Sequence, residues 1–178
     1  VLASGSSVRS RLLTEAGVPH TVEPPAINEV AAYAAASDGN SVALELARRK
    51  ALDVLKRHPN AWVIGCDQVL DCEGTLMTKP ADVEAARTQL VNLRGRTHRL
   101  CTAVAIARAG EVVWECLESP RLTMWMFDDE TLGIYIGAAG DALRSPGAYH
   151  LEEDGAALFE HVDGDFNTVL GLALGPLL

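Results

Sequence analysis

The feature that most constrains this chain is an apolar run over residues 61–70, which a single acid interrupts. Its length and its β-branched residues predict one buried strand. An acid at Asp67 in such a strand is costly unless a cation, a metal or a substrate meets its carboxylate. Asp67 is therefore our candidate reactive centre. The alternative interpretation is a structural Asp whose carboxylate accepts hydrogen bonds from backbone N–H groups of a neighbouring loop.

Composition sets the class of protein to expect. A chain of 178 residues with 48% hydrophobic and 22% charged residues predicts a single globular domain over residues 1–178. The net charge of −9 argues against a protein that tracks along nucleic acid, although a phosphate site needs only a few local cations. The sequence contains no apolar run of about 18 residues, so we expect no membrane span.

The cysteines indicate a compartment. The four cysteines form neither a CxxC pair nor a zinc-binding spacing, so we expect free thiols in a reducing cytoplasm. If the chain self-associates, a homodimer is the arrangement to expect.

The start of the chain predicts a strand, a turn and a helix. Residues 1–3 are apolar, residues 4–7 are a Ser/Gly turn, and apolar residues then recur at helical spacing as far as Gly17. A turn that opens a helix offers free N–H groups and a positive dipole end to an anion, and Arg9 and Arg11 would add charge. The alternative interpretation is an ordinary Ser N-cap followed by surface arginines.

The next segment carries a candidate metal ligand. Residues 19–23 predict a short strand, and the two prolines that follow hold Glu29 on an extended segment or turn. Mg²⁺ takes oxygen ligands and usually only one or two carboxylates, so Glu29 could bind it. The alternative is an exposed loop acid. Residues 31–40 are rich in Ala, Ser, Asp, Gly and Asn, and we expect this segment to be mobile.

A strong amphipathic pattern begins at Ser41, which we expect to be the N-cap, and ends before His58. In this helix Lys50 lies beside apolar Ala47 and Ala51, which predicts that its side chain turns inward. The remaining elements that we expect are a turn at 71–74, a helix over 81–93, strands over 100–107, 112–117 and 121–127, a helix from Asp128, and a loop over most of the final third. This order predicts a mixed α/β fold with hairpins rather than a purely parallel sheet.

Taken together, acids and cations suggest phosphate chemistry. The candidates are the first turn, Glu29, Lys50, Asp67, Lys79 and Arg96. Carboxylates with several cations suit metal-assisted chemistry on a polyphosphate. The residues alone therefore indicate a nucleotide hydrolase and leave its base and the attacked phosphate open.

The chain resembles the Maf family of nucleoside triphosphate pyrophosphatases nearly from end to end. The segments that carry the likeness are Leu2-Ala3-Ser4-Gly5-Ser6, Ile64-Gly65-Cys66-Asp67-Gln68-Val69, Lys79-Pro80, Leu93-Arg94-Gly95-Arg96-Thr97-His98, Gly147-Ala148-Tyr149 and Gly164-Asp165-Phe166 with Val169-Leu170-Gly171-Leu172. Each motif alone is weak, and their order and spacing make the resemblance specific.

The resemblance implies a fold, a reaction and site residues. The fold would be a long bent mixed sheet flanked by helices, Maf/ITPase-like, with two lobes and a cleft. The reaction would hydrolyse a nucleoside triphosphate to the monophosphate and diphosphate with Mg²⁺ or Mn²⁺. Matched residue by residue, the phosphate-binding turn is Ser4, Ser6 and Arg9, the phosphate-side lysines are Lys50 and Lys79, the metal-associated acid is Glu29, and the proton acceptor is Asp67.

Departures from the family pattern indicate a branch. The first turn has Val8 where an Arg is common, Gln68 follows the catalytic acid where the dTTP/UTP branch has Thr, and Glu152 stands where that branch has Gln. These three residues resemble the branch acting on 7-methyl-GTP, because Glu152 could pair with a methylated, cationic guanine.

Two other readings stay open. One is a dTTP/UTP enzyme of the same family, and the other is a nucleotide-sensing, division-associated protein that has lost turnover. The second is motivated by Asn28, where an acid is common, and by Ser7 and Val8 in the first turn. The family usually continues into a further C-terminal helix, so we expect the chain to have been longer.

Overall fold

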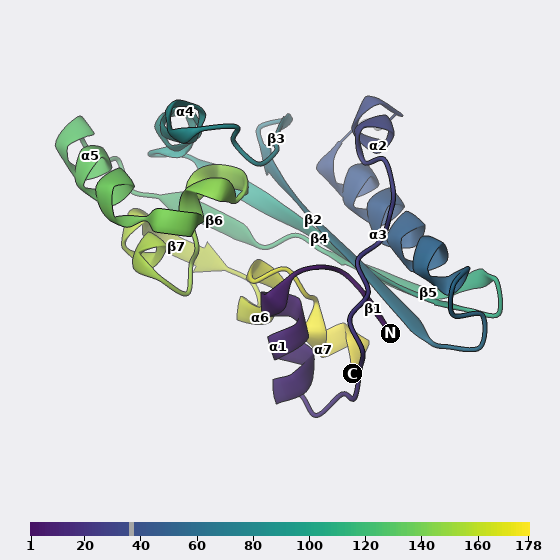
Figure 1. The fold of residues 1–178 in the computed structure, drawn as a ribbon. Coiled ribbons are helices and arrows are strands. Elements are labelled where there is room, and N and C mark those ends of the chain that lie inside the picture. Colours follow the sequence, from purple (N-terminus) through teal and green to yellow (C-terminus); the bar gives the residue numbers. More distant parts are fainter. Residues whose placement is uncertain (36–37) are drawn as a thin grey trace. The chain divides into compact units, whose positions relative to one another are not determined.

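The protein folds around a mixed β-sheet, shown in Figure 1 as a computed structural model that describes residues 1–35 and 38–178. The seven strands run in the order β1-β2-β4-β6-β7, with β3 paired to β2 and β5 to β4. Parallel and antiparallel pairs both occur, so the predicted mixed α/β class is confirmed.

The bounds of the elements are as follows. The strands are β1 (Leu2–Ala3), β2 (Val63–Cys72), β3 (Thr75–Met77), β4 (Thr97–Arg108), β5 (Glu111–Glu118), β6 (Arg121–Met124) and β7 (Phe159–Asp163). The helices are α1 (Ser7–Glu15), α2 (Val30–Ala35), α3 (Gly39–Leu55), α4 (Val83–Leu93), α5 (Asp129–Ala138), α6 (Phe166–Val169) and α7 (Leu174–Leu177). The 3₁₀ turns are η1 (Gly140–Arg144), η2 (Pro146–Ala148) and η3 (Asp154–Leu158).

The chain forms two compact units, and most contacts between residues lie within one unit or the other. Unit 1 comprises Val1–Gln68, Cys101–Ser119 and Asp165–Leu178, and unit 2 comprises Val69–Leu100 and Pro120–Gly164. Strands β2 and β4 each contribute residues to both. That residues 1–178 form a single domain stays a prediction.

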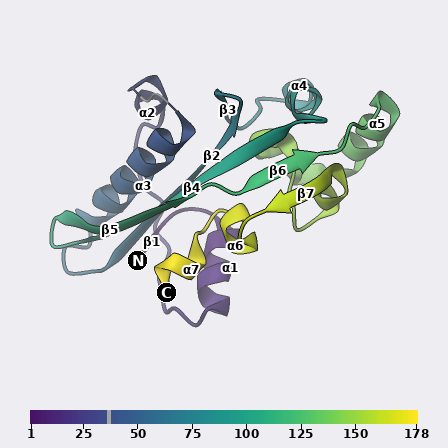
Figure 2. The same ribbon diagram turned by 180° about the vertical axis from the view of Figure 1, so that it is seen from behind.

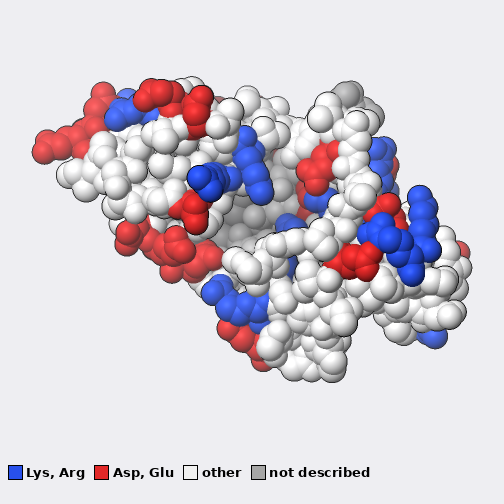
Figure 3. Space-filling model, viewed as in Figure 1, with Lys and Arg blue, Asp and Glu red and all other residues white. Residues whose placement is uncertain are grey.

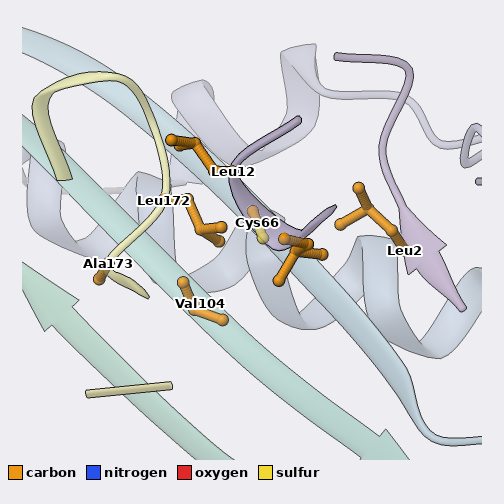
Figure 4. Close-up of a cluster of buried hydrophobic side chains, with 7 residues drawn as sticks. Leu2, Leu12, Cys66, Val104, Leu172 and Ala173 are labelled. Carbon is orange, nitrogen blue, oxygen red and sulfur yellow. The ribbon is translucent and has the colours of Figure 1, made fainter. Parts of the chain in front are cut away.

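Unit 1 is built on the parallel pair β1–β2 and the β4–β5 hairpin. Its apolar cluster joins the chain's beginning, middle and end through Leu2, Leu12, Cys66, Val104 and Leu172, all nearly inaccessible to solvent (Figure 4). The first and last helices of the chain also meet in unit 1, where α1 and α7 lie side by side in Figure 1 and in the reverse view of Figure 2. The C-terminal segment is therefore part of the core of unit 1.

A glycine brings α3 against β2 in unit 1. A Cβ at Gly65 would lie 2.6 Å from the backbone nitrogen of Ala51 and closer still to the carbonyl oxygen of Ala47. Because both contacts are with helix backbone, only glycine permits this approach. The close packing buries Lys50, on the same face of α3, beside the middle of β2.

Unit 2 contains the other strand pairs and a buried aromatic cluster. β3 returns antiparallel to β2, and β6 pairs with β7 and with the first residues of β4. His98 is 1% exposed and packs against the rings of Tyr149 and Phe159. Its Nε2 lies 2.7 Å from the Tyr149 hydroxyl, and its Nδ1 has no hydrogen-bond partner among the described residues.

Several expected elements differ from those observed. The strand expected over residues 19–23 is reduced to one bridge between Leu2 and Val22. Within the segment 31–40 that was expected to be mobile, residues 31–35 belong to helix α2, and residues 36 and 37 lie outside the described part of the chain. The N-cap of α3 is Asp38, whose carboxylate accepts from the Ser41 N–H, rather than Ser41 itself. β7 was not predicted.

The surface and the thiols agree with the composition. On the face seen in Figure 3, Lys and Arg are scattered among Asp and Glu. All four cysteines are free, and three of them are buried, as expected. Among the described helices, none combines the length and the apolar character that crossing a bilayer requires.

Candidate functional site

The centre of the candidate site is a buried ion pair between α3 and β2. The Lys50 Nζ lies 2.5 Å from Asp67 Oδ1, and the two residues are 8% and 6% exposed. The same Nζ lies 2.7 Å from the Glu29 carboxylate, which is half exposed. The structure thus brings together three residues predicted from sequence. It also shows that Asp67 is met by a cation, which is one of the conditions its burial requires.

Burial governs the chemistry of Asp67. Desolvation raises the pKa of this carboxyl group, and the charges of Lys50 and Arg9 oppose that shift. A carboxylate whose proton affinity is increased in this way is a better proton acceptor than one in water.

Tyr33 is a neighbour of this cluster that sequence reasoning missed. It lies on α2, four residues after Glu29, and is partly buried. Burial first, and the negative charges of Asp67 and Glu29 second, raise the pKa of Tyr33 to about 12. Its hydroxyl therefore stays protonated and can donate a hydrogen bond. A lone Tyr in an Ala-rich segment gives no sequence signal for this placement.

The first turn of the chain is organised by its own serines. The Ser6 side chain caps α1 by accepting from the Arg9 N–H, and the Ser4 Oγ accepts from the Ser6 N–H and from Arg9 Nη1. Both predicted interpretations of this turn, an N-cap and an anion cradle, are compatible with that geometry. Val8 packs on the apolar cluster of unit 1.

The Arg9 guanidinium is held in a fixed place. Its Nε donates to the Gly171 carbonyl at 2.8 Å, and its Nη1 donates to the Cys66 carbonyl at 3.2 Å. Cys66 directly precedes Asp67, so the cation is fastened to the strand that carries the candidate base. Sequence spacing alone could not have placed Gly171 beside Arg9.

Gln68 points its amide into the C-terminal turn of unit 1. Its Nε2 donates to the Thr102 hydroxyl at 2.8 Å and to the carbonyls of Thr168 and Val169, each at 3.0 Å. The Thr168 hydroxyl in turn donates to Glu118 at 2.5 Å. Thr102, Thr168 and Glu118 were not singled out from sequence, because a buried polar network spread over distant segments leaves no local pattern.

The remaining candidates lie in unit 2 or have local roles. Lys79 is exposed between β3 and α4, and Glu152 is exposed in the turn after Tyr149. Arg96 is exposed and forms an ion pair with Glu73 at 3.1 Å. Asn28 accepts from the Val30 N–H at 3.0 Å, so it helps to begin α2.

The carboxylates near Lys50 are the candidate ligands of a divalent metal. No group of three or more His, Cys, Asp or Glu side chains that could hold an ion occurs in the described ranges 1–35 and 38–178. Two carboxylates, Glu29 and Asp67, do converge on one ammonium. One or two carboxylates completed by substrate phosphates is a usual Mg²⁺ environment, so the residues present fit such an ion.

Comparison with known proteins identifies the family. The model of the Maf-like protein family matches residues 1–178. The chain belongs to this family. A relative from Paramagnetospirillum magneticum, named nucleoside triphosphate pyrophosphatase, is 46% identical over all of this chain and 94% of its own length. Relatives named 7-methyl-GTP pyrophosphatase, from Brucella abortus and Mesorhizobium japonicum, are 44% and 42% identical, over all of this Maf-like chain and 92% of their own lengths. These names describe hydrolases, so the expectation of an enzyme is confirmed.

Proposed function

We propose that this Maf-like protein hydrolyses a nucleoside triphosphate, preferentially 7-methyl-GTP, to the monophosphate and diphosphate. The observation that carries the proposal is the buried Asp67 that shares the Lys50 ammonium with Glu29. The names of the relatives support the reaction class. A buried acid of raised pKa, a buried cation and a second carboxylate are the groups that such a hydrolysis needs.

In the proposed reaction Asp67 accepts a proton from the attacking water. The new bond joins the water oxygen to one phosphorus of the anhydride between the α- and β-phosphates. The bond from that phosphorus to the bridging oxygen breaks, which releases the monophosphate and the diphosphate. Lys50 holds the Asp67 carboxylate in one orientation and places positive charge next to the reacting group. Tyr33, which stays protonated, supplies a neutral donor near the same carboxylates.

Phosphate binding is proposed for the cations and hydroxyls that the resemblance identified. Arg9, Ser4 and Ser6 lie together at the N-terminus of α1, where backbone N–H groups and the helix dipole favour an anion. Lys79 and Arg96 are proposed as phosphate-side cations on the resemblance alone.

A divalent cation is proposed as the cofactor, with Glu29 as its main protein ligand. Mg²⁺ or Mn²⁺ would neutralise negative charge on the phosphates. Glu29 suits this role because its carboxylate is half exposed and already turned toward the cluster. Its present partner is the Lys50 ammonium, which Asp67 also binds.

The base preference is proposed from Glu152; Val8, which packs on the apolar cluster of unit 1, supports it through the resemblance alone. Methylation gives the guanine ring a positive charge, and an exposed carboxylate such as Glu152 could pair with that charge or accept from the ring's N–H donors. Two of the relatives compared here carry 7-methyl-GTP in their names, which supports the choice.

The test is diphosphate release from 7-methyl-GTP, GTP, dTTP, UTP and CTP, each with and without Mg²⁺ or Mn²⁺. We expect metal-dependent release that is fastest for 7-methyl-GTP. Preference for dTTP or UTP would keep the reaction and overturn the base assignment. Nucleotide binding without any release would favour the sensing protein instead.

A cytoplasmic location and a homodimer complete the proposal. The free, mostly buried thiols suit a reducing compartment. Size-exclusion chromatography with light scattering measures the oligomeric state directly.

A further inference from the structure

We infer that Gln68 is a positioning residue, which sets the Arg9 guanidinium through the turn over residues 168–171. The inference rests on the proposed function, since it assumes that Arg9 binds phosphate. It differs from the role that the resemblance suggests for Gln68, which is to read the base.

The side-chain amide of Gln68 donates hydrogen bonds to three oxygen acceptors. A primary amide has two N–H donors, and here they serve three oxygens, two of them the successive carbonyls of Thr168 and Val169. Successive carbonyls at the end of a helix lack partners within the helix. Gln68 thus satisfies the C-terminal end of α6, a helix of only four residues.

Further hydrogen bonds hold the turn that Gln68 contacts. The Thr168 carbonyl also accepts from the Thr102 hydroxyl at 3.1 Å and from the Gly171 N–H at 3.0 Å. Thr168 itself is inaccessible to solvent, and its hydroxyl donates to Glu118. With so many bonds converging on one buried residue, the turn has little freedom once the Gln68 amide is in place.

Gly171, the last residue of this turn, is the residue that contacts Arg9. Gly171 has a φ of +102°, which favours glycine, and a Cβ there would lie 3.3 Å from Arg9 Nε. Its carbonyl receives the Arg9 Nε–H at 2.8 Å. The guanidinium is therefore fixed on one side by the turn that Gln68 holds and on the other by the Cys66 carbonyl of β2. Through the turn over residues 168–171, Gln68 therefore affects the phosphate end of the substrate, which Arg9 is proposed to bind.

The experiment uses a probe without a base, inorganic tripolyphosphate, and measures its Kd for the full chain by calorimetry. Gln68→Met keeps the length of the side chain and removes its donors. We expect this variant to bind tripolyphosphate about fivefold more weakly and to leave the kcat/KM ratio of 7-methyl-GTP to UTP unchanged. In an Arg9→Gln background the same substitution should have no further effect on Kd.

Two further variants separate positioning from a general loss of structure. Gly171→Ala disturbs the far end of the turn without touching Gln68 and should weaken tripolyphosphate binding in the same way. Ser119→Ala removes another half-buried hydrogen bond of unit 1, to Asn40, and should leave the Kd unchanged. If Gln68→Met does not fold, Gln68→Asn, which keeps a shorter amide, replaces it.

The outcomes decide between the two roles. An unchanged tripolyphosphate Kd with a shifted base ratio would overturn the inference and return Gln68 to base reading. Full additivity with Arg9→Gln would also overturn it. If the wild type binds tripolyphosphate but hydrolyses no nucleotide, the proposed function fails and this inference is still tested. If it binds no tripolyphosphate, the solvent exchange of the Arg9 Nε–H, measured by NMR, decides: faster exchange in Gln68→Met supports the link, and equal exchange refutes it.

Discussion

At the scale of single residues, the pairing of Lys50 with two carboxylates decides what a substitution at Asp67 should do. Asp67→Asn removes the proton acceptor, and we expect kcat to fall by about 10²–10⁴. The fold should persist, because the Lys50 ammonium keeps Glu29 as a partner 2.7 Å away and is not left buried and unpaired. Steady-state kinetics and a thermal melt measure the two effects.

The matched control is another buried Asp of β2. Asp71 is 1% exposed and pairs with Arg99 at 2.6 Å. Asp71→Asn should lower the melting temperature and leave kcat close to that of the wild type. Wild-type turnover in Asp67→Asn would make Asp67 a structural acid.

The sequence predicted this centre better than it predicted the surroundings of the centre. Asp67 stood out because an acid interrupts an apolar strand, and Lys50 because it interrupts the apolar face of a helix. Arg9 was predicted as a cation of the first turn. That Gly171 and Cys66 hold it in place follows only from the fold, since their carbonyls carry no side-chain signal.

At the scale of elements, the contact between α3 and β2 sets the distance from Lys50 to Asp67. Gly65→Ala would press a methyl group against the helix backbone at Ala47 and Ala51. We expect a loss of about 1–3 kcal/mol in the free energy of unfolding, as for overpacked cores, together with a lower kcat because α3 must move. Urea unfolding and steady-state kinetics give both quantities.

Gly137→Ala is the control for this substitution. Gly137 lies in α5, and a Cβ there would meet nothing within 4 Å. Alanine at that position should leave stability unchanged or raise it by up to about 1 kcal/mol. Equal behaviour of the two variants would show that the close approach at Gly65 does not constrain α3.

Elements with strong periodicity were predicted and those without it were missed. The bounds of α4 and α5 agree with expectation because an Asp precedes an apolar helical pattern in each. α2 was missed because its six residues are mostly Ala and give no apolar face. β7 was missed because it follows 3₁₀ turns and exposes most of its side chains. Its sequence therefore shows neither the alternation of a half-buried strand nor the spacing of an amphipathic helix.

At the scale of the whole molecule, stability should depend on pH in part through the buried His98. Burial lowers the pKa of His98 from 6.5 to about 4. Below pH 6.5 the unfolded chain therefore binds a proton that the folded chain refuses, and stability is lost as the pH falls toward 4. His98 by itself should lower the free energy of unfolding by up to about 1.4 kcal/mol per pH unit in this window.

Urea unfolding between pH 7 and pH 4 measures this dependence. His98→Phe should be less stable at pH 7, because the Tyr149 hydroxyl loses its partner, and should show a shallower decline with acid. His161→Gln, at an exposed position of β7, should decline in parallel with the wild type. Parallel curves for His98→Phe and the wild type would contradict the assignment.

The bond between Arg9 and Gly171 also has a consequence for biosynthesis. The arginine leaves the ribosome 162 residues before the carbonyl that fixes it, so this bond forms only after residue 171 has been synthesised. A nascent chain arrested before Gly171 would hold the candidate base, its lysine and its metal-side acid, yet its Arg9 Nε–H would lack this acceptor. The Arg9 guanidinium is therefore expected to reach its final position only after synthesis has passed Gly171.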